Sequence, residues 1–281
     1  MAETELDHRL STMRDIVRRL GRVAVAYSGG VDSAFVLKVC VDTLGASNVL
    51  AVTGRSPSLA AAELVAARDL AATLGAVHVE VDTDEFNDPN YISNPTNRCY
   101  YCKTELYTRM APLLVERGMT AVVNGTNADD LADYRPGLAA AGEHAVRSPC
   151  AEAGLTKSDI RALSARWGLP THDKPASPCL SSRVQYGETI TPDKLRMIER
   201  AEALLRELGF RQCRVRHHDK LARIEVPAGE IERLAEKTIR ERIDAAFREL
   251  GYQYVTLDLR GFRSGSMNEV IAFGRRQAPA E

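Results

Sequence analysis

Hydrophobic residues in the first half of the chain follow two alternating patterns. Short apolar runs, which are typical of buried parallel strands, occur at 23–27, 49–53, 77–81 and 121–123. Between these runs, apolar residues recur at helical spacing, which predicts helices over 6–20, from Val31 onward, and over 59–74, 104–117 and 156–167. Strands that alternate with helices of this length indicate an α/β fold, in which a parallel sheet carries helices on both faces.

The remaining segments show other patterns. Residues 82–96 are polar, without a clear period, and predict a loop, whereas 170–190 are rich in Pro, Ser and Gly and predict a boundary region. Beyond it, the pattern predicts a helix at 191–208, strands at 213–217 and 222–226, a helical stretch at 230–250, and strands near 254–259 and 270–273. We therefore expect one domain over 1–185 and a smaller C-terminal α+β domain over 186–281, which is long enough for its own core.

Composition narrows the class of protein. The chain of 281 residues is 44% hydrophobic and 27% charged, with a net charge of −1, which argues against a general nucleic-acid-coating or membrane-surface protein. It has no apolar leader and no apolar run of membrane-spanning length, so we expect a cytoplasmic protein without a membrane partner. Its six cysteines favour thiols or metal ligands over a disulfide framework.

A glycine-rich loop, Ser-Gly-Gly-Val-Asp-Ser at 28–33, follows the first predicted strand and opens a helix. Two glycines permit a tight turn and a close backbone approach, and a helix N-terminus attracts anions. Asp32 suits a Mg²⁺ ion placed between its carboxylate and bound phosphates. The loop matches neither GxxxxGK[ST] nor GxGxxG; it resembles the SGGxDS loop of the PP-loop ATP pyrophosphatases. A strand–turn–helix without a ligand is the alternative.

A second polar loop, Gly-Thr-Asn-Ala-Asp-Asp at 125–130, follows the fourth predicted strand. Because ligands bind beyond the carboxyl ends of parallel strands, we expect it beside the first loop, with carboxylates for Mg²⁺; a solvated turn with an N-capping Asp is the alternative. Lys157 and Arg161 share one helix face and either neutralise pyrophosphate charge or lie exposed. The candidate ATP-binding residues are Ser28, Gly29, Gly30, Val31, Asp32, Ser33, Thr53, Gly125, Asp130, Lys157 and Arg161.

The cysteines form two groups. Cys99 and Cys102 lie in a predicted loop that enters a helix, and Cys179 lies in the Pro- and Ser-rich stretch. A pair three positions apart presents both sulfurs to one metal, and a distant third completes the site. Three thiolates favour a [4Fe–4S] cluster with one open iron over zinc, which needs a fourth ligand such as His172; redox or simple thiol chemistry is the other alternative. We expect core or edge positions for Cys40 and Cys213, and a structural role for Cys150.

Arginines are prominent in the second domain. Arg214 and Arg216 share one face of a predicted strand, and Arg260, Arg263, Ser264, Ser266 and Asn268 lie in a Gly-rich stretch. Arginine beside glycine and hydroxyls suits the bidentate capture of phosphate or carboxylate. A solvated surface fits the spacing equally well.

Taken together, the motifs resemble the LarE family over about residues 10–274. They are found at 28–33, 98–103, 125–130, 177–183, 186–187 and 261–268. The resemblance implies a PP-loop (adenine nucleotide alpha-hydrolase-like) fold and a sulfurtransferase that makes pyridinium-3,5-bisthiocarboxylic acid mononucleotide, the organic part of the nickel-pincer cofactor of lactate racemase. ATP activates each substrate carboxylate as an acyl-adenylate, and sulfur then replaces AMP.

The family also implies roles for individual residues. Some members use one cysteine, at the position of Cys179, as a sacrificial sulfur donor; others hold a [4Fe–4S] cluster with three. The additional Cys99 and Cys102 make this chain resemble the cluster type. The implied catalytic residues are Cys179, Asp32 and Arg183; the implied substrate-binding residues are Ser182, Arg183, Arg214, Arg216 and Arg263; and Glu202 and Glu225 are candidates for an acidic metal-binding patch. The implied partners are a sulfide donor, other nickel-pincer biosynthesis proteins and further copies of the chain, with the C-terminal domain serving substrate binding and oligomerisation.

Two other functions compete with this interpretation. A PP-loop tRNA thiolase also carries a CxxC pair and a third cysteine, but the net charge of −1 and the lack of a further cysteine pair weigh against it. A non-enzymatic cluster- or nickel-handling protein regulated by nucleotide would bind ATP without releasing pyrophosphate. Asp32 and Asp130 near the phosphates favour catalysis.

Overall fold

The computed structural model describes residues 2–132 and 135–263. The chain forms two compact units, one of 1–87 with 97–177 and the other of 88–96 with 178–281. The chain thus passes into the second unit after Ser177, a few residues before the boundary drawn from the sequence, and a short earlier segment also belongs to that unit.

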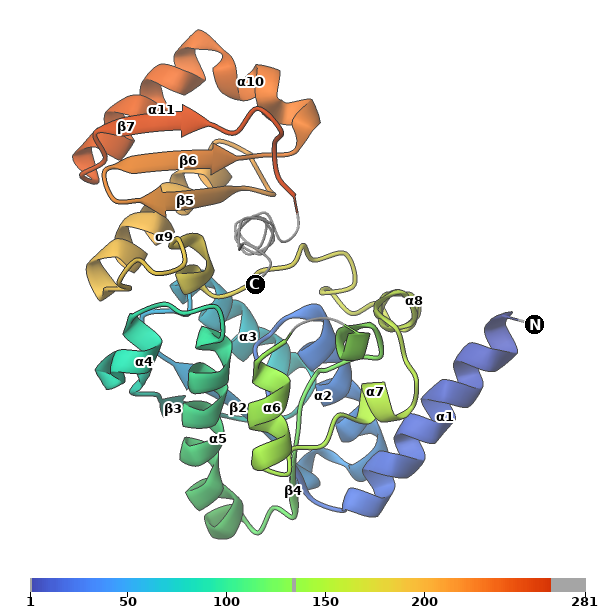
Figure 1. Ribbon diagram of the computed structural model, residues 1–281. Helices are drawn as coiled ribbons and strands as arrows, with labels where there is room; N and C mark the ends of the chain where they lie inside the picture. The colour runs from blue at the N-terminus through green and yellow to red at the C-terminus, as the bar shows by residue number, and fades with distance from the viewer. Residues whose placement is uncertain (1, 133–134, 264–281) are drawn as a thin grey trace, which may run out of the picture. The chain divides into compact units, whose positions relative to one another are not determined.

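The first unit contains the parallel sheet that the sequence predicted (Figure 1). Its four strands lie in the order β3-β2-β1-β4. Its strands are β1 (Val23–Ala26), β2 (Val49–Arg55), β3 (Val77–Asp82) and β4 (Ala121–Val123). All of β1 is buried because it lies between two neighbouring strands and under helices on both faces.

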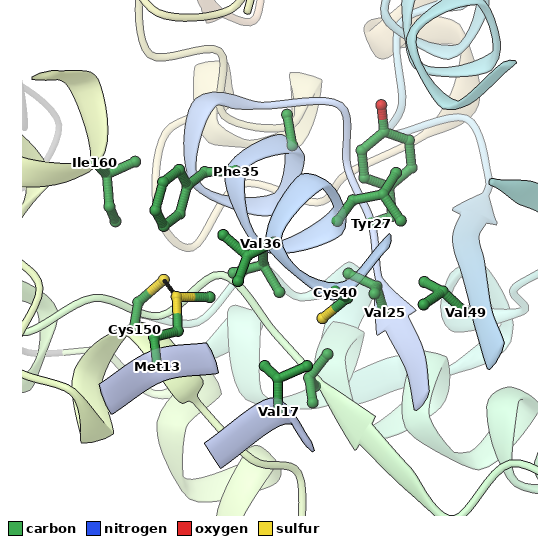
Figure 2. Packing of buried hydrophobic residues seen from close by; sticks show 14 of the residues in the cluster. Met13, Val17, Val25, Tyr27, Phe35, Val36, Cys40, Val49, Cys150 and Ile160 are labelled. Atoms are coloured by element: carbon green, nitrogen blue, oxygen red, sulfur yellow. Dashed lines mark hydrogen bonds between the residues drawn. The ribbon is translucent and has the colours of Figure 1, made fainter. Parts of the chain in front are cut away.

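Helices cover both faces of this sheet. They are α1 (Ala2–Leu20), α2 (Val31–Leu44), α3 (Ala61–Thr73), α5 (Arg98–Arg117), α6 (Gly137–Glu143), α7 (Pro149–Glu152) and α8 (Lys157–Arg166). Successive strand residues point to opposite faces: Val23 and Val25 join a core with α1, α2, α3 and α8 (Figure 2), whereas Ala24 and Ala26 join a core with α5 and α6.

Two sequence predictions about this region were wrong, and two short helices were missed. Residues 82–96 are not all loop, because they contain a short 3-10 turn at Glu85–Asn87 and the helix α4 (Pro89–Ile92), which Asp88 caps through a bond from the Asn90 amide. Helix α5 begins at Arg98 rather than at 104, so Cys99 and Cys102 lie in its first turns and not in a loop. Helices α6 and α7 were not predicted, because they are too short and too rich in Ala, Gly and Pro to show an apolar period.

The second unit is the predicted α+β module. It contains η4 (Leu180–Arg183), α9 (Pro192–Glu207), β5 (Arg214–His218), β6 (Leu221–Glu225), α10 (Ile231–Ala235), α11 (Lys237–Glu249) and β7 (Tyr254–Leu257). Strand β6 pairs antiparallel with β5 and parallel with β7, over a core that is separate from those of the first unit. The strand predicted near 270–273 lies outside the described residues. Over the described ranges, none of the helices has both the length and the apolar character needed to cross a membrane.

Candidate nucleotide site and cysteine loop

The candidate nucleotide site lies at the carboxyl ends of β1 and β4. Helix α2 follows β1 and packs on one face of the sheet, whereas α5 leads into β4 and packs on the other. The chain therefore changes direction between these two neighbouring strands. In open α/β sheets, ligands bind at this switch point, beyond the carboxyl ends of the strands.

The glycine-rich loop is a tight turn that only glycine allows at one position. Gly29 has a φ of +69°, and a Cβ there would lie 2.8 Å from the Cβ of Ala67 in α3. The Ser33 hydroxyl lies 3.1 Å from that of Ser28, accepts from the Ser28 amide and donates to the Gly30 carbonyl. These bonds hold the loop closed on itself, and Gly30 has no side chain with which to cap α2.

The second predicted loop reaches the N-terminus of α2. A Cβ on Gly125 would lie 2.8 Å from the Ser33 nitrogen and 3.0 Å from the Asp32 side chain, so glycine is what permits this approach. Asn127 extends the contact, because its amide nitrogen lies 3.4 Å from Asp32 Oδ1. The structure thus brings together two loops that are about a hundred residues apart in the sequence.

Charged side chains of the site are already paired. Lys157, the first residue of α8, places its Nζ 2.5 Å from Asp32 Oδ2. Its backbone amide donates to the side chain of Asp129. Asp130 is buried; it accepts from the Asn127 amide and forms an ion pair of 2.7 Å with Arg135. Asp32 and Lys157 are therefore the groups next to the glycine-rich loop, whereas Asp130 is bonded to its own loop and to Arg135.

Two other predicted residues are bonded elsewhere. Arg161 donates to the backbone carbonyls of His172 and Lys174. The buried Thr53 hydroxyl donates to the Tyr27 carbonyl at 2.7 Å and lies 2.8 Å from His78 Nε2. Arg161 therefore supports the backbone of 172–174, and Thr53 ties the end of β2 to the end of β1.

Three residues at the loop were missed by the sequence reasoning. Lys174 Nζ lies 3.2 Å from the Gly29 carbonyl and 2.7 Å from Glu63 in the first turn of α3. Ser177 donates to the other oxygen of Glu63 at 3.0 Å. No period or motif marks Lys174, which lies in the Pro- and Ser-rich stretch. Ser177 begins the motif at 177–183, but nothing in that motif indicates Glu63 as its partner.

The cysteines divide by burial. Cys40 and Cys150 lie inside the core in Figure 2, and Cys213 lies in the core of the second unit, as the sequence predicted. Burial raises the pKa of Cys40 to about 12 and that of Cys213 to about 11, and it also raises the pKa of Cys150. These three thiols therefore stay protonated and unreactive at neutral pH.

The other three cysteines are accessible. Cys99 is exposed, and Cys102 and Cys179 are half-buried. Cys99 and Cys102 lie one helical turn apart on α5 in the first unit, whereas Cys179 precedes η4 in the second. Over the described residues no cluster of three or more His, Cys, Asp or Glu side chains is arranged to hold a metal ion. The convergence of the three sulfurs therefore stays a prediction.

A buried guanidinium organises the loop around Cys179. Arg183 is 1% exposed and forms two bonds, of 2.9 and 3.1 Å, with the fully buried Glu202. It also donates to the carbonyl of Cys179 at 3.0 Å and to that of Pro178, and the Ser182 hydroxyl donates to the same Cys179 carbonyl at 2.8 Å. Through these bonds, Arg183 and Ser182 fix the backbone on both sides of the cysteine.

The glutamates predicted as an acidic metal-binding patch are instead each paired with arginine. Glu202 contacts Arg206 as well as Arg183, and Glu225 contacts Arg216 at 2.8 Å and Arg223 at 3.2 Å. Burial raises the pKa of Glu202, but the nearby arginines outweigh it and hold that pKa below its usual value. In the structure both carboxylates pair with arginines, two of which, Arg183 and Arg216, are buried. Their role as a metal-binding patch stays a prediction.

The remaining predicted arginines lie close to the same network. Arg216 donates to the Ser182 carbonyl at 3.1 Å, which links β5 to the cysteine loop. Arg214 is buried with its guanidinium over the Phe262 ring, and burial, followed by repulsion from Arg183, lowers its pKa to about 10. Arg263 donates to the Gly261 carbonyl and pairs with Asp258. Ser264, Ser266 and Asn268 lie outside the described residues.

Fold and loop together define the class of protein. A parallel sheet in the order β3-β2-β1-β4, with Ser-Gly-Gly-Val-Asp-Ser at its switch point, is a PP-loop nucleotide-binding domain. The NAD synthase family model matches residues 6–94. The glutamine-dependent NAD(+) synthetase of Rhodobacter capsulatus is 38% identical over 91 residues, which are 31% of this chain and 16% of that protein.

Other relatives match nearly the whole chain. The pyridinium-3,5-bisthiocarboxylic acid mononucleotide synthase of Lactiplantibacillus plantarum is 40% identical over 261 residues, which are 93% of this chain and 94% of that enzyme. An uncharacterized protein of Synechocystis sp. is 47% identical over 266 residues, 95% of this chain and 99% of the other. The chain belongs to the LarE family.

Proposed function

We propose that this protein is an ATP-dependent sulfurtransferase that converts pyridinium-3,5-biscarboxylic acid mononucleotide into the bisthiocarboxylic acid mononucleotide. The observation that carries the proposal is the extent of its identity with the L. plantarum synthase. The matched region spans 93% of the chain, so it extends through the second unit as well as the nucleotide domain. An NAD synthetase-like nucleotide domain alone would match only the first unit.

The first unit performs the activation step. A carboxylate is a poor electrophile, so its oxygen attacks the α-phosphorus of ATP, pyrophosphate leaves, and the acyl-adenylate forms. The loop at 28–33 binds the phosphates, with the N-terminus of α2 directed at them. Lys157 lies beside Asp32, where its charge offsets the charge that develops on the leaving pyrophosphate.

Asp32 fits a magnesium ion. Mg²⁺ in nucleotide sites is held by one or two carboxylates together with substrate phosphates, and Asp32 is a partly exposed carboxylate beside the phosphate-binding loop. When bound, the ion neutralises phosphate charge. Asp130 is bonded to Asn127 and Arg135, so it supports this loop indirectly.

The three accessible cysteines fit a [4Fe–4S] cluster in their chemistry. Cys99 and Cys102 share a helical turn, and together with Cys179 they are the cysteines not buried in a core. Held by these three thiolates, such a cluster would leave one iron open to a sulfur ligand. In the transfer step, sulfide attacks the activated carbonyl carbon and AMP leaves. Arg183 and Ser182 hold the Cys179 backbone for this step.

The arginine network of the second unit supports a site for an anionic substrate. Around Glu202 and Glu225 the cations outnumber the carboxylates, so a phosphate or carboxylate group would balance the excess charge. Ser182, Arg183, Arg214, Arg216 and Arg263 bind the mononucleotide in this proposal. We further propose a cytoplasmic homo-oligomer that is supplied by a sulfide donor and acts with other nickel-pincer biosynthesis proteins.

The test is pyrophosphate release by anaerobically purified protein given ATP and the pyridinium dicarboxylate mononucleotide. We expect release that depends on this substrate and a product that gains sulfur, measured by mass spectrometry. Iron and sulfide are measured in parallel, and Cys102→Ala should lose most of both. ATP binding without pyrophosphate release contradicts catalysis, and tight tRNA binding at physiological salt favours a tRNA thiolase instead.

A further inference from the structure

We propose that Lys174 is a second phosphate-binding cation of the nucleotide site. It lies in the segment 172–177, and none of the motifs identified in the sequence includes it. The inference rests on the proposed use of ATP and adds a residue to that site. In this proposal, Lys174 contacts the same phosphates that the loop at 28–33 binds.

The position of the lysine ammonium carries the proposal. Lys174 Nζ lies 3.2 Å from the Gly29 carbonyl, so a charge sits directly against the glycine-rich turn. The contact is made to the backbone of the loop and not to a side chain. The Lys174 side chain is 21% exposed, which leaves it accessible to a ligand.

Glu63 holds the lysine in this position. Its carboxylate lies 2.7 Å from Lys174 Nζ, and Ser177 bonds its other oxygen. A partly exposed ion pair contributes little to folding stability, so the free energy of unfolding gives little reason for this arrangement. An incoming phosphate has more negative charge than one carboxylate and replaces Glu63 as the partner of the ammonium.

The arrangement repeats a feature on the other side of the loop. There Lys157 pairs with Asp32 at the start of α2. Each side of the loop thus has one lysine that is paired with one carboxylate. Arg161 fixes the Lys174 backbone by donating to the carbonyls of His172 and Lys174. Both cations are thus held in place by α8, either directly or through one arginine.

A purely structural role for Lys174 makes a different prediction. If the lysine only ties the segment 172–177 to α3, loss of either partner of the Lys174–Glu63 pair disturbs the loop in the same direction. If the lysine binds phosphate, loss of the cation weakens nucleotide binding, whereas loss of the competing carboxylate does not. Comparing variants of the two residues therefore separates the roles.

The experiment measures binding of α,β-methylene-ATP, in which the bond broken by the reaction is replaced, with Mg²⁺ by calorimetry. Lys174→Met is expected to bind about tenfold or more weakly, the size of a lost charge-assisted bond. Glu63→Gln should bind at least as tightly as the wild type. Lys38→Met, which removes an α2 lysine paired with Asp42, should bind like the wild type. Lys174→Arg should recover most of the lost affinity.

The outcomes that overturn the proposal are distinct. Wild-type affinity in Lys174→Met, or equal weakening in Lys174→Met and Glu63→Gln, rejects the phosphate-binding role while ATP use stands. A wild-type protein that does not bind the analogue rejects the proposed function and this inference with it. If Lys174→Met does not fold, Lys174→Gln takes its place, because the amide keeps donors for Glu63 and Gly29 but has no charge; the same loss is expected.

Discussion

Arg183 and Glu202 form a buried ion pair in which neither side chain is more than 1% exposed. The pair connects the loop of Cys179 to helix α9. The same guanidinium also donates to the backbone carbonyls of Pro178 and Cys179. Removing one partner of such a pair leaves an uncompensated charge in the interior, which destabilises a protein strongly.

Glu202→Gln is therefore expected to lower the free energy of unfolding by about 3 kcal/mol or more, measured by urea denaturation. The substitution leaves Arg183 and Arg206 without their shared carboxylate. Glu207→Gln, an exposed change on the same helix, should alter stability by less than about 0.5 kcal/mol. Equal effects of the two changes would contradict the importance of the buried pair.

The pH dependence of stability should report the same carboxylate. The pKa of Glu202 is lowered in the folded state, so its stabilising effect is complete above the usual glutamate pKa of about 4.5 and is lost as pH falls toward the folded pKa. The difference in stability between the wild type and Glu202→Gln should shrink as the pH is lowered from 7 to below about 4. A constant difference across that range would show that charge is not the cause.

Gly29→Ala should lose nucleotide binding and destabilise the fold by about 1–3 kcal/mol. The added methyl group would meet Ala67 at 2.8 Å, and φ at this position is +69°. Gly142→Ala is the matched control, because Gly142 lies in α6 with nothing within 4 Å of the added Cβ; it should stabilise the protein by about 0.5–1 kcal/mol. Thermal unfolding and titration with α,β-methylene-ATP measure both properties.

Asp32→Asn should reduce substrate-dependent pyrophosphate release by about a hundredfold or more, since it removes the charge expected at the magnesium ion and the partner of Lys157. The Lys157–Asp32 pair is partly exposed, so stability should change by less than about 1 kcal/mol. Asp42→Asn, an exposed change on the same helix, should leave the rate unaffected. A rate in Asp32→Asn within a few-fold of the wild type would remove Asp32 from the mechanism.

Thiol labelling should divide the cysteines into two groups. In reduced, cluster-free protein at pH 8, iodoacetamide should modify Cys99, Cys102 and Cys179, whereas Cys40, Cys150 and Cys213 react only after unfolding. Burial raises the pKa of the latter three and keeps them protonated. Peptide mass spectrometry gives the sites, and rapid labelling of Cys150 in the folded protein would contradict its place in the core.

Local patterns were enough to predict the sheet. Neighbouring residues alone determine the apolar runs that form β1 to β4. The same is true of the Ser-Gly-Gly turn after β1 and of the helix that starts at Val31. The start of α5 was missed because its first turns, which contain Cys99, Tyr100 and Cys102, show no apolar period.

Contacts between distant residues account for the rest of what was missed. The bond from Lys174 to Gly29 spans 145 residues, and no motif near Lys174 indicates its partner. Likewise, nothing in the sequence around Glu202 distinguishes it from an exposed glutamate on a helix. Only the tertiary structure places Arg183 against it. Residues such as Arg161, predicted for the site by helical spacing, are instead used to hold backbone carbonyls.

Helix α8 serves both lysines at the glycine-rich loop. A capping box formed by Thr156 and Asp159 closes its first turn, Lys157 projects from that turn, and Arg161 follows one turn later to grip the chain at Lys174. If this end of the helix frayed, both Lys157 and Lys174 would be held less firmly beside the glycine-rich loop. The capping hydroxyl of Thr156 is thus coupled to the placement of both lysines, and Thr156→Val, which removes that hydroxyl, would affect the proposed phosphate site from outside it.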